Sequence, residues 1–184
     1  MSKGNDLTLD KTFELAVQNH KKNNLQVAEK LYNEVLEIDP NHSIAFNNLA
    51  ILYEKLEEYQ KAIDCLKKSI EINPGDINTL NNLGIILKEL GDYEQAKKCF
   101  KKAIKINPNN AKTFSNLGVV LNFLGQYKKA LIIFEQGLKL DPSSITLQKN
   151  ITSHHINNLV DFKKANDLSY KVLKIYHNNF NFIN

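Results

Sequence analysis

The chain contains no arginine and no tryptophan, and all 24 of its cationic side chains are lysine. Arginine is the side chain that binds phosphate and carboxylate through paired hydrogen bonds and that recognises guanine edges. Its absence from a chain of net charge +4 therefore argues against nucleic-acid recognition. The lysines between residues 97 and 129 are mixed with acids such as Glu94, and we interpret them as solvent-exposed helix faces.

Long apolar runs are also missing. The longest runs fall far short of the roughly 18 consecutive apolar residues that a membrane span requires, and the segment MSKGNDLTLDK lacks the apolar stretch of a secretory signal. Hydrophobic residues nevertheless make up 42% of the chain, which is enough for a continuous core. We expect a soluble cytoplasmic protein without a membrane partner.

Proline is scarce but regularly placed, because Pro40, Pro74, Pro108 and Pro142 are each 34 residues apart. The residues between them repeat one pattern of apolar, small and turn-forming positions. A fixed period of this length indicates one supersecondary unit stacked on itself. Such an array offers an extended binding surface more readily than a catalytic pocket.

The two cysteines, Cys65 and Cys99, are also 34 residues apart and so occupy the same place in neighbouring repeats. Layers of packed helices are roughly 10 Å apart, whereas a disulfide bridges alpha carbons no more than roughly 7 Å apart. We therefore expect two free thiols, as is usual in a reducing compartment.

Residues 77–110 show the repeating unit most clearly. Apolar residues at spacings of three and four predict two amphipathic helices, with Gly84 leaving room for close helix packing. Gly91 and Asp92 predict the turn between the helices, because glycine accepts the left-handed conformation and aspartate caps the next helix. The predicted buried positions of this unit are Leu80, Leu83, Leu87, Ala96, Phe100, Ala103 and Ile104.

Equivalent residues recur in the neighbouring units, closely at Phe46, Leu49, Ala50, Tyr53, Ala62, Leu66, Phe114, Leu117, Gly118, Leu121, Ala130 and Phe134, and more loosely at Leu15, Ala16, Ala28 and Tyr32. This pattern resembles the tetratricopeptide repeat family. The resemblance implies an all-α fold, a right-handed α-solenoid of about five helix-turn-helix repeats. The family's tryptophan is replaced by other large apolar residues, namely Phe46, Leu80 and Phe114.

The repeat predicts the organisation of the whole chain. Residues 145–177 form a degenerate repeat, whose polar residues at otherwise buried positions suit a terminal cap. The predicted segments are a flexible N-terminus (1–8), an array (9–177) with repeats at 9–42, 43–76, 77–110, 111–144 and 145–177, and an apolar tail (178–184).

The first helices of such arrays line the concave side, and their exposed residues here are mainly asparagine and aliphatic. An asparagine amide offers both donors and an acceptor, which match the backbone of an extended peptide. We therefore predict a groove that binds a protein segment or extended peptide. The alternative is compositional bias, since the chain holds 25 asparagines. The predicted groove residues are Asn47, Asn48, Ile51, Asn81, Asn82, Ile85, Ser115, Asn116, Val119 and Asn150.

The chain shows no catalytic, cofactor or metal motif. It lacks a glycine-rich phosphate loop and a nucleophile elbow, and its acids lie among lysines. The adjacent His154 and His155 point about 100° apart around a helix, which does not suit one metal ion. A chaperone carboxyl terminus is not an expected ligand, because cations are lacking at the inner positions Phe13, Val17, Asn48, Asn82 and Asn116.

Two alternatives to a non-catalytic adaptor remain. The first helices are similar to the substrate-binding arrays of O-GlcNAc transferases and of repeat-fused glycosyl- and sulfotransferases, which would make the chain a substrate-presenting segment or a relative of such an enzyme. The other alternative is self-assembly into a weak homo-oligomer through the C-terminal end, where Phe180, Phe182 and Ile183 are apolar.

Overall fold

The computed structural model describes residues 3–157, and over this range it contains nine α-helices and no strand. The predicted all-α class is therefore confirmed. By its internal contacts the chain divides into two compact units, Met1–Ile86 and Leu87–Asn184, and each is described by itself.

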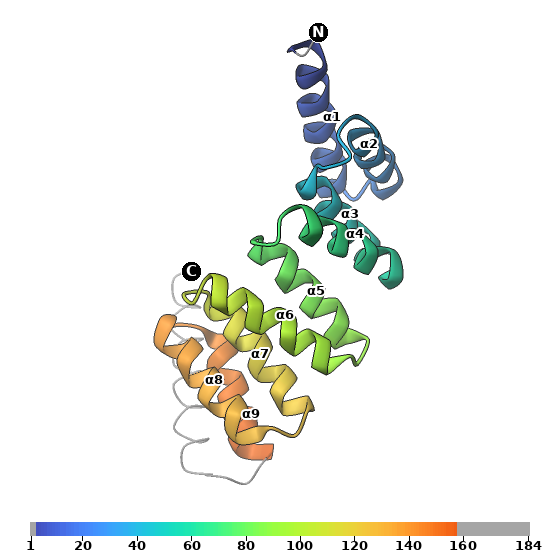
Figure 1. Cartoon of the computed structure of the whole chain (residues 1–184). Helices are drawn as coiled ribbons and strands as arrows, with labels where there is room; N and C mark the ends of the chain where they lie inside the picture. The colour runs from blue at the N-terminus through green and yellow to red at the C-terminus, as the bar shows by residue number, and fades with distance from the viewer. Residues whose placement is uncertain (1–2, 158–184) are drawn as a thin grey trace, which may run out of the picture. The chain divides into compact units, whose positions relative to one another are not determined.

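The first unit consists of two helical hairpins followed by most of a further helix. The hairpins are α1 with α2 and α3 with α4, and α3 also contacts both α1 and α2 (Figure 1). The two first helices of the hairpins are thus direct neighbours. The helices are α1 (Lys3–Lys21), α2 (Leu25–Ile38), α3 (Ser43–Lys55), α4 (Tyr59–Ile72) and α5 (Ile77–Glu89), which crosses the boundary between the units.

The second unit repeats this arrangement around one complete hairpin. Helix α7 packs against α8, and it also contacts α6 before it and α9 after it. Helix α9 in turn packs against α8, so three helices meet at this end of the described chain. The helices are α6 (Tyr93–Ile106), α7 (Ala111–Phe123), α8 (Tyr127–Leu140) and α9 (Ile145–Asn157).

Polar side chains fix the connection at each proline. The residue before the proline, Asp39, Asn73, Asn107 or Asp141, accepts the backbone N–H two residues further on, at 2.9 to 3.3 Å. This local bond is the turn that asparagine and aspartate favour. The following helix is then capped by a side chain that accepts the N–H three residues on, from His42, Asp76, Asn110 or Ser144.

The turn inside each hairpin requires a left-handed residue. The backbone angle φ is +62° at Asn23, +60° at Glu57, +80° at Gly91 and +69° at Gly125. These four residues are also 34 positions apart, so one turn geometry is used in every hairpin. Glycine adopts it freely, whereas glutamate does so at a steric cost.

Large residues of the second helices fill the core, and glycine makes room for one of them. Tyr32, Leu66, Phe100 and Phe134 occupy equivalent positions and are fully buried. A Cβ atom placed on Gly118 of α7 would lie 2.3 Å from the ring of Phe134. Glycine is therefore required at 118 by the close approach of α7 and α8.

The described helices differ from the predicted segments at the N-terminus. Helices α3, α5, α7 and α9 begin at the first residues of the predicted repeats, but α1 begins at Lys3 and not at Leu9. Helix α1 therefore includes residues that lie before the predicted start of the array. The second half of the fifth repeat and the apolar tail 178–184 lie outside the described residues.

The cysteines Cys65 and Cys99 are free thiols, as predicted, and each is half-buried. Burial, and then the nearby carboxylate of Asp64, raises the pKa of the Cys65 thiol to about 11. Burial also raises the pKa of Cys99. Both side chains are therefore thiols at neutral pH and not the reactive thiolates of a catalytic cysteine.

Candidate functional site

The sixth residue of each later repeat is an asparagine on a first helix, and none of these side chains is fully buried. Asn48 lies on α3, Asn82 on α5, Asn116 on α7 and Asn150 on α9, and each is half-buried. Asn48 hydrogen-bonds the hydroxyl of Tyr32, which partly offsets the burial that raises the pKa of that tyrosine to about 12.

Two of these asparagines are held by the preceding first helix. In the first unit, Nδ2 of Asn82 donates to Oδ1 of Asn47 at 3.0 Å. In the second unit, Nδ2 of Asn150 donates to Oγ of Ser115, also at 3.0 Å. Each bond joins residues 35 positions apart, so the same tie recurs between neighbouring first helices.

Asn47 and Ser115 were predicted to contact a ligand, but both are buried, at 9% and 6% exposure. Their side chains accept hydrogen bonds from the next first helix and so orient the asparagine that remains at the surface. Oδ1 of Asn47 also accepts from the hydroxyl of Thr79 at 3.3 Å. Their place in the structure is therefore behind the surface and not on it.

The remaining predicted groove residues keep part of their surface open. Asn81 is half-buried, and so are the aliphatic residues of the predicted strip, Ile51, Ile85 and Val119. The first unit thus presents amides and aliphatic groups from α3 and α5, and the second presents the same chemistry from α7 and α9. In each unit the surface is uncharged at these positions.

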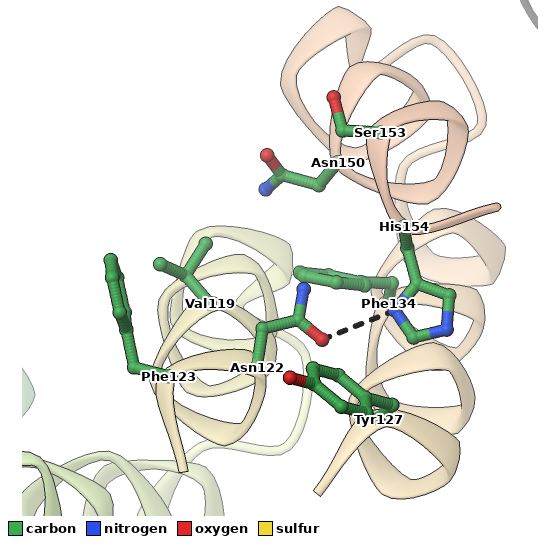
Figure 2. Close-up of a pocket in the computed structure, with 8 residues that line it drawn as sticks. All are labelled: Val119, Asn122, Phe123, Tyr127, Phe134, Asn150, Ser153 and His154. Carbon is green, nitrogen blue, oxygen red and sulfur yellow. Dashed lines mark hydrogen bonds between the residues drawn. The ribbon is translucent and has the colours of Figure 1, made fainter. Parts of the chain in front are cut away.

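The second unit also contains a pocket of about 380 Å³ between α7, α8 and α9. Two predicted groove residues, Val119 and Asn150, belong to its lining. Figure 2 shows these side chains around a common space, with Phe134 between α7 and α9. The lining residues are Val119, Asn122, Phe123, Tyr127, Phe134, Asn150, Ser153 and His154.

A histidine and an amide are paired at the edge of this pocket. Nδ1 of His154 lies 3.1 Å from Oδ1 of Asn122, as the dashed line in Figure 2 shows. His154 is 2% exposed, and its ring meets that of Tyr127 edge-on at 6.4 Å. Burial, and then the neighbouring charge of His155, lowers the pKa of His154. The imidazole is therefore neutral at physiological pH.

Phe123 and Tyr127 place two large rings at the pocket with much of their surface in solvent, at 60% and 47% exposure. Phe123 is stacked on Tyr93 of α6, with centroids 4.7 Å apart and planes 1° from parallel. The stacking holds the Phe123 ring in one orientation, although the side chain is exposed.

Sequence reasoning identified the first-helix positions but missed the pocket. The available signal was a set of residues that break the 34-residue pattern, since Asn122 and Phe123 stand where the preceding repeat has Lys88 and Glu89. Ser153, equivalent to Val119, removes an aliphatic side chain and leaves space. Only the structure shows that these positions meet around one cavity.

No group of three or more histidine, cysteine, aspartate or glutamate side chains within residues 3–157 is placed to hold a metal ion. The rings of His154 and His155 are perpendicular, with centroids 5.9 Å apart. Over the same residues, no helix has both the length and the apolar character needed to cross a membrane.

Several solved structures are similar in fold. The crystal structure of MamA is 21% identical, with a TM-score of 0.83 over 90% of this chain and 96% of that chain. YrrB, described as a TPR protein with an unusual peptide-binding site, is 22% identical, with a TM-score of 0.74 over 89% of this chain and 84% of its own. PilF of Pseudomonas aeruginosa is 24% identical, with a TM-score of 0.81 over 92% and 77%.

No curated protein sequence matches the chain significantly. Family models described as "Tetratricopeptide repeat" match at residues 13–42, at 43–76 and 77–110, and at 99–132. These matches cover most of the described helices, and two of them, at 13–42 and 43–76, each contain one hairpin or most of it. Together with the helix order, the turn geometry and the 34-residue period, they establish that the chain belongs to the tetratricopeptide repeat family.

Proposed function

We propose that this chain is a non-catalytic interaction module that binds an extended peptide segment of a partner protein on its first-helix surfaces. The supporting observation is that Asn82 and Asn150 are each held by a hydrogen bond to the preceding first helix and, within residues 3–157, keep a free acceptor. Asn82 and Asn150 each use one N–H for the tie, and among the described residues their Oδ1 atoms have no hydrogen-bond partner. A held amide with a free acceptor and a second N–H matches a peptide backbone, which offers both N–H and C=O.

The hydrogen bond to the preceding first helix makes peptide binding by these asparagines more favourable than binding by an asparagine that moves freely at the surface. A side chain that is already held loses less conformational entropy when a ligand binds. Each neutral hydrogen bond still contributes only about 0.5 to 1.5 kcal/mol against water. A few such bonds with aliphatic contacts give affinities in the micromolar range, which suits a reversible adaptor.

The absence of charge at the predicted groove positions also indicates which kind of peptide they bind. The groove positions in both units carry amides, a hydroxyl and aliphatic groups, so backbone recognition dominates over charge. The description of YrrB as a peptide-binding repeat protein is consistent with this use of the fold. The proposed contacts are Asn48, Asn82, Asn116 and Asn150 with Ile51, Ile85, Val119 and Asn81, supported from behind by Asn47 and Ser115.

The test is a selection of peptides from a displayed library on the full-length chain, followed by calorimetry of the selected peptide. Asn82→Ala combined with Asn116→Ala should weaken binding about tenfold or more, since each tenfold change corresponds to about 1.4 kcal/mol. The matched control is Asn33→Ala with Asn109→Ala, two exposed asparagines away from the first-helix surfaces. Circular dichroism confirms that both variants remain helical.

Two results would contradict the proposal. One is a selected peptide whose affinity is the same for the groove variant and for the control variant. The other is a library selection that yields no binder to the folded chain. A loss of affinity confined to the groove variant supports the proposal.

A further inference from the structure

The pocket of the second unit departs from the repeat in its charge. At the equivalents of Asn122 and Phe123, the earlier repeats carry the charged pairs Glu54-Lys55 and Lys88-Glu89. Seven of the eight lining residues have side chains that carry no charge. The eighth, His154, is neutral because burial lowers its pKa. In a chain with 24 cations and 20 anions, this neutral lining is a local property of the pocket.

A second departure supports the first. His154 stands where the first helices α3, α5 and α7 have the buried aliphatic residues Leu52, Ile86 and Val120. Its Nδ1 atom lies 3.1 Å from Oδ1 of Asn122, and the tautomer with the proton on Nδ1 donates to that oxygen. The histidine therefore fixes the orientation of the Asn122 amide. The Nδ2 donor of that amide is then turned away from His154, toward the interior of the pocket (Figure 2).

The aromatic side chains give the pocket its shape. Phe134 is fully buried, Tyr127 is held against His154, and Phe123 is stacked on Tyr93. These rings are thus restrained before any ligand arrives, although Phe123 and Tyr127 expose about half of their surface or more. Aromatic pairs in offset or edge-on contact gain about 0.5 to 1.5 kcal/mol beyond the area that they bury.

We propose that this pocket anchors one uncharged aromatic side chain of the bound peptide, an inference that rests on the proposed function. A charged side chain would meet no opposite charge there, because every lining residue is uncharged, whereas an aromatic ring would contact the rings of the lining. The volume of about 380 Å³ lies near the lower end of the range for binding pockets and accommodates a ring with its adjoining backbone. Nδ2 of Asn122 and Oδ1 of Asn150 are available to that backbone.

The probe is N-acetyl-phenylalanine amide, compared with N-acetyl-lysine amide and N-acetyl-glutamate amide, titrated into the isotope-labelled full-length chain. The phenylalanine probe should shift the NMR signals of the Val119 methyl groups and of the Asn122 side-chain amide at millimolar concentration. The two charged probes should leave these signals unchanged. Equal shifts with all three probes, or none with the phenylalanine probe, would overturn the assignment.

Two tryptophan variants provide the structural control. Ser153→Trp places a large side chain at the pocket, whereas Gln136→Trp places one on the exposed side of α8. We expect the first variant to abolish the response to the phenylalanine probe and the second to preserve it. Probe binding that survives Ser153→Trp would place the aromatic site elsewhere and contradict the proposal.

The outcomes distinguish the proposed aromatic site in the pocket from the proposed peptide binding on the first-helix surfaces. If Asn82→Ala with Asn116→Ala weakens the selected peptide while Ser153→Trp does not, the groove is supported and the anchor is refuted. If the signals of Val119 depend on protein concentration without probe, a second copy occupies the pocket. If Phe180→Ser or Phe182→Ser shifts those signals in the free protein, the chain's own segment occupies it. Either of the last two results would also overturn the inference.

Discussion

At the scale of single residues, the turn of the second hairpin places a residue with a Cβ atom, Glu57, in a left-handed backbone conformation. Glu57 has φ of +60° in a turn where the equivalent residues Gly91 and Gly125 are glycine. A left-handed conformation costs a residue with a Cβ atom roughly 1 to 2 kcal/mol. The period of the sequence locates this turn, but only the backbone angle identifies Glu57 as strained.

We predict that Glu57→Gly stabilises the chain by about 0.5 to 1 kcal/mol, because relief of the turn exceeds the added entropy of the unfolded state. Gly91→Ala should have the opposite sign, since a Cβ atom at Gly91 meets no neighbour within 4 Å and acts only through the backbone. Urea unfolding followed by circular dichroism measures both changes. A destabilising Glu57→Gly would show that the turn carries no strain.

At the scale of helices, the side-chain tie between neighbouring first helices is the feature that sequence reasoning could not supply. The helix starts at Ser43, Ile77 and Ala111 follow from the period, and so do the large buried residues of the second helices. That Asn82 donates to Asn47 depends on rotamers and on helix spacing, which a repeat pattern does not specify. Asn47 was therefore expected at the surface and lies behind it.

We predict that Asn47→Ala destabilises the chain by about 0.5 to 1.5 kcal/mol, the net contribution of a neutral hydrogen bond. The bond that is lost is the one from the Asn82 amide to Oδ1 of Asn47, whereas the hydroxyl of Thr79 keeps Asp76 and Ser69 as partners. Asn33→Ala, an exposed position on α2, serves as control and should change the unfolding midpoint very little. Equal midpoints for the two variants would mean that the tie does not contribute to stability.

At the scale of the whole molecule, the buried His154 and the half-buried His20 couple stability to pH. Burial is the main cause that lowers the pKa of His154 and of His20, with smaller effects of His155 and of Lys55 respectively. The unfolded chain therefore binds protons at a higher pH than the folded chain does. The contribution of the neutral histidines to the free energy of unfolding is fully present above their pKa in the unfolded chain, about 6.5. It is lost as the pH falls from that value toward their lower pKa values in the folded chain.

We predict that the urea midpoint decreases between neutral pH and about pH 5.5, where carboxylates are still ionised. His154→Leu restores the residue type of Leu52 at the equivalent position and should weaken this dependence, and adding His20→Leu should weaken it further. If the urea midpoint of the double variant depends on pH as strongly as that of the unaltered chain, titratable groups other than these two histidines cause the dependence.

The proposed peptide-binding surfaces join these scales, because in each unit they are formed by a side chain that the preceding first helix holds. The decisive measurement is a crystal structure of the full-length chain with the library-selected peptide. We expect the peptide backbone within hydrogen-bond distance of the Asn150 amide, with an uncharged ring between Val119 and Ser153 of the same unit. A peptide that lies instead along the outer helices α4, α6 or α8 would contradict this mode of recognition.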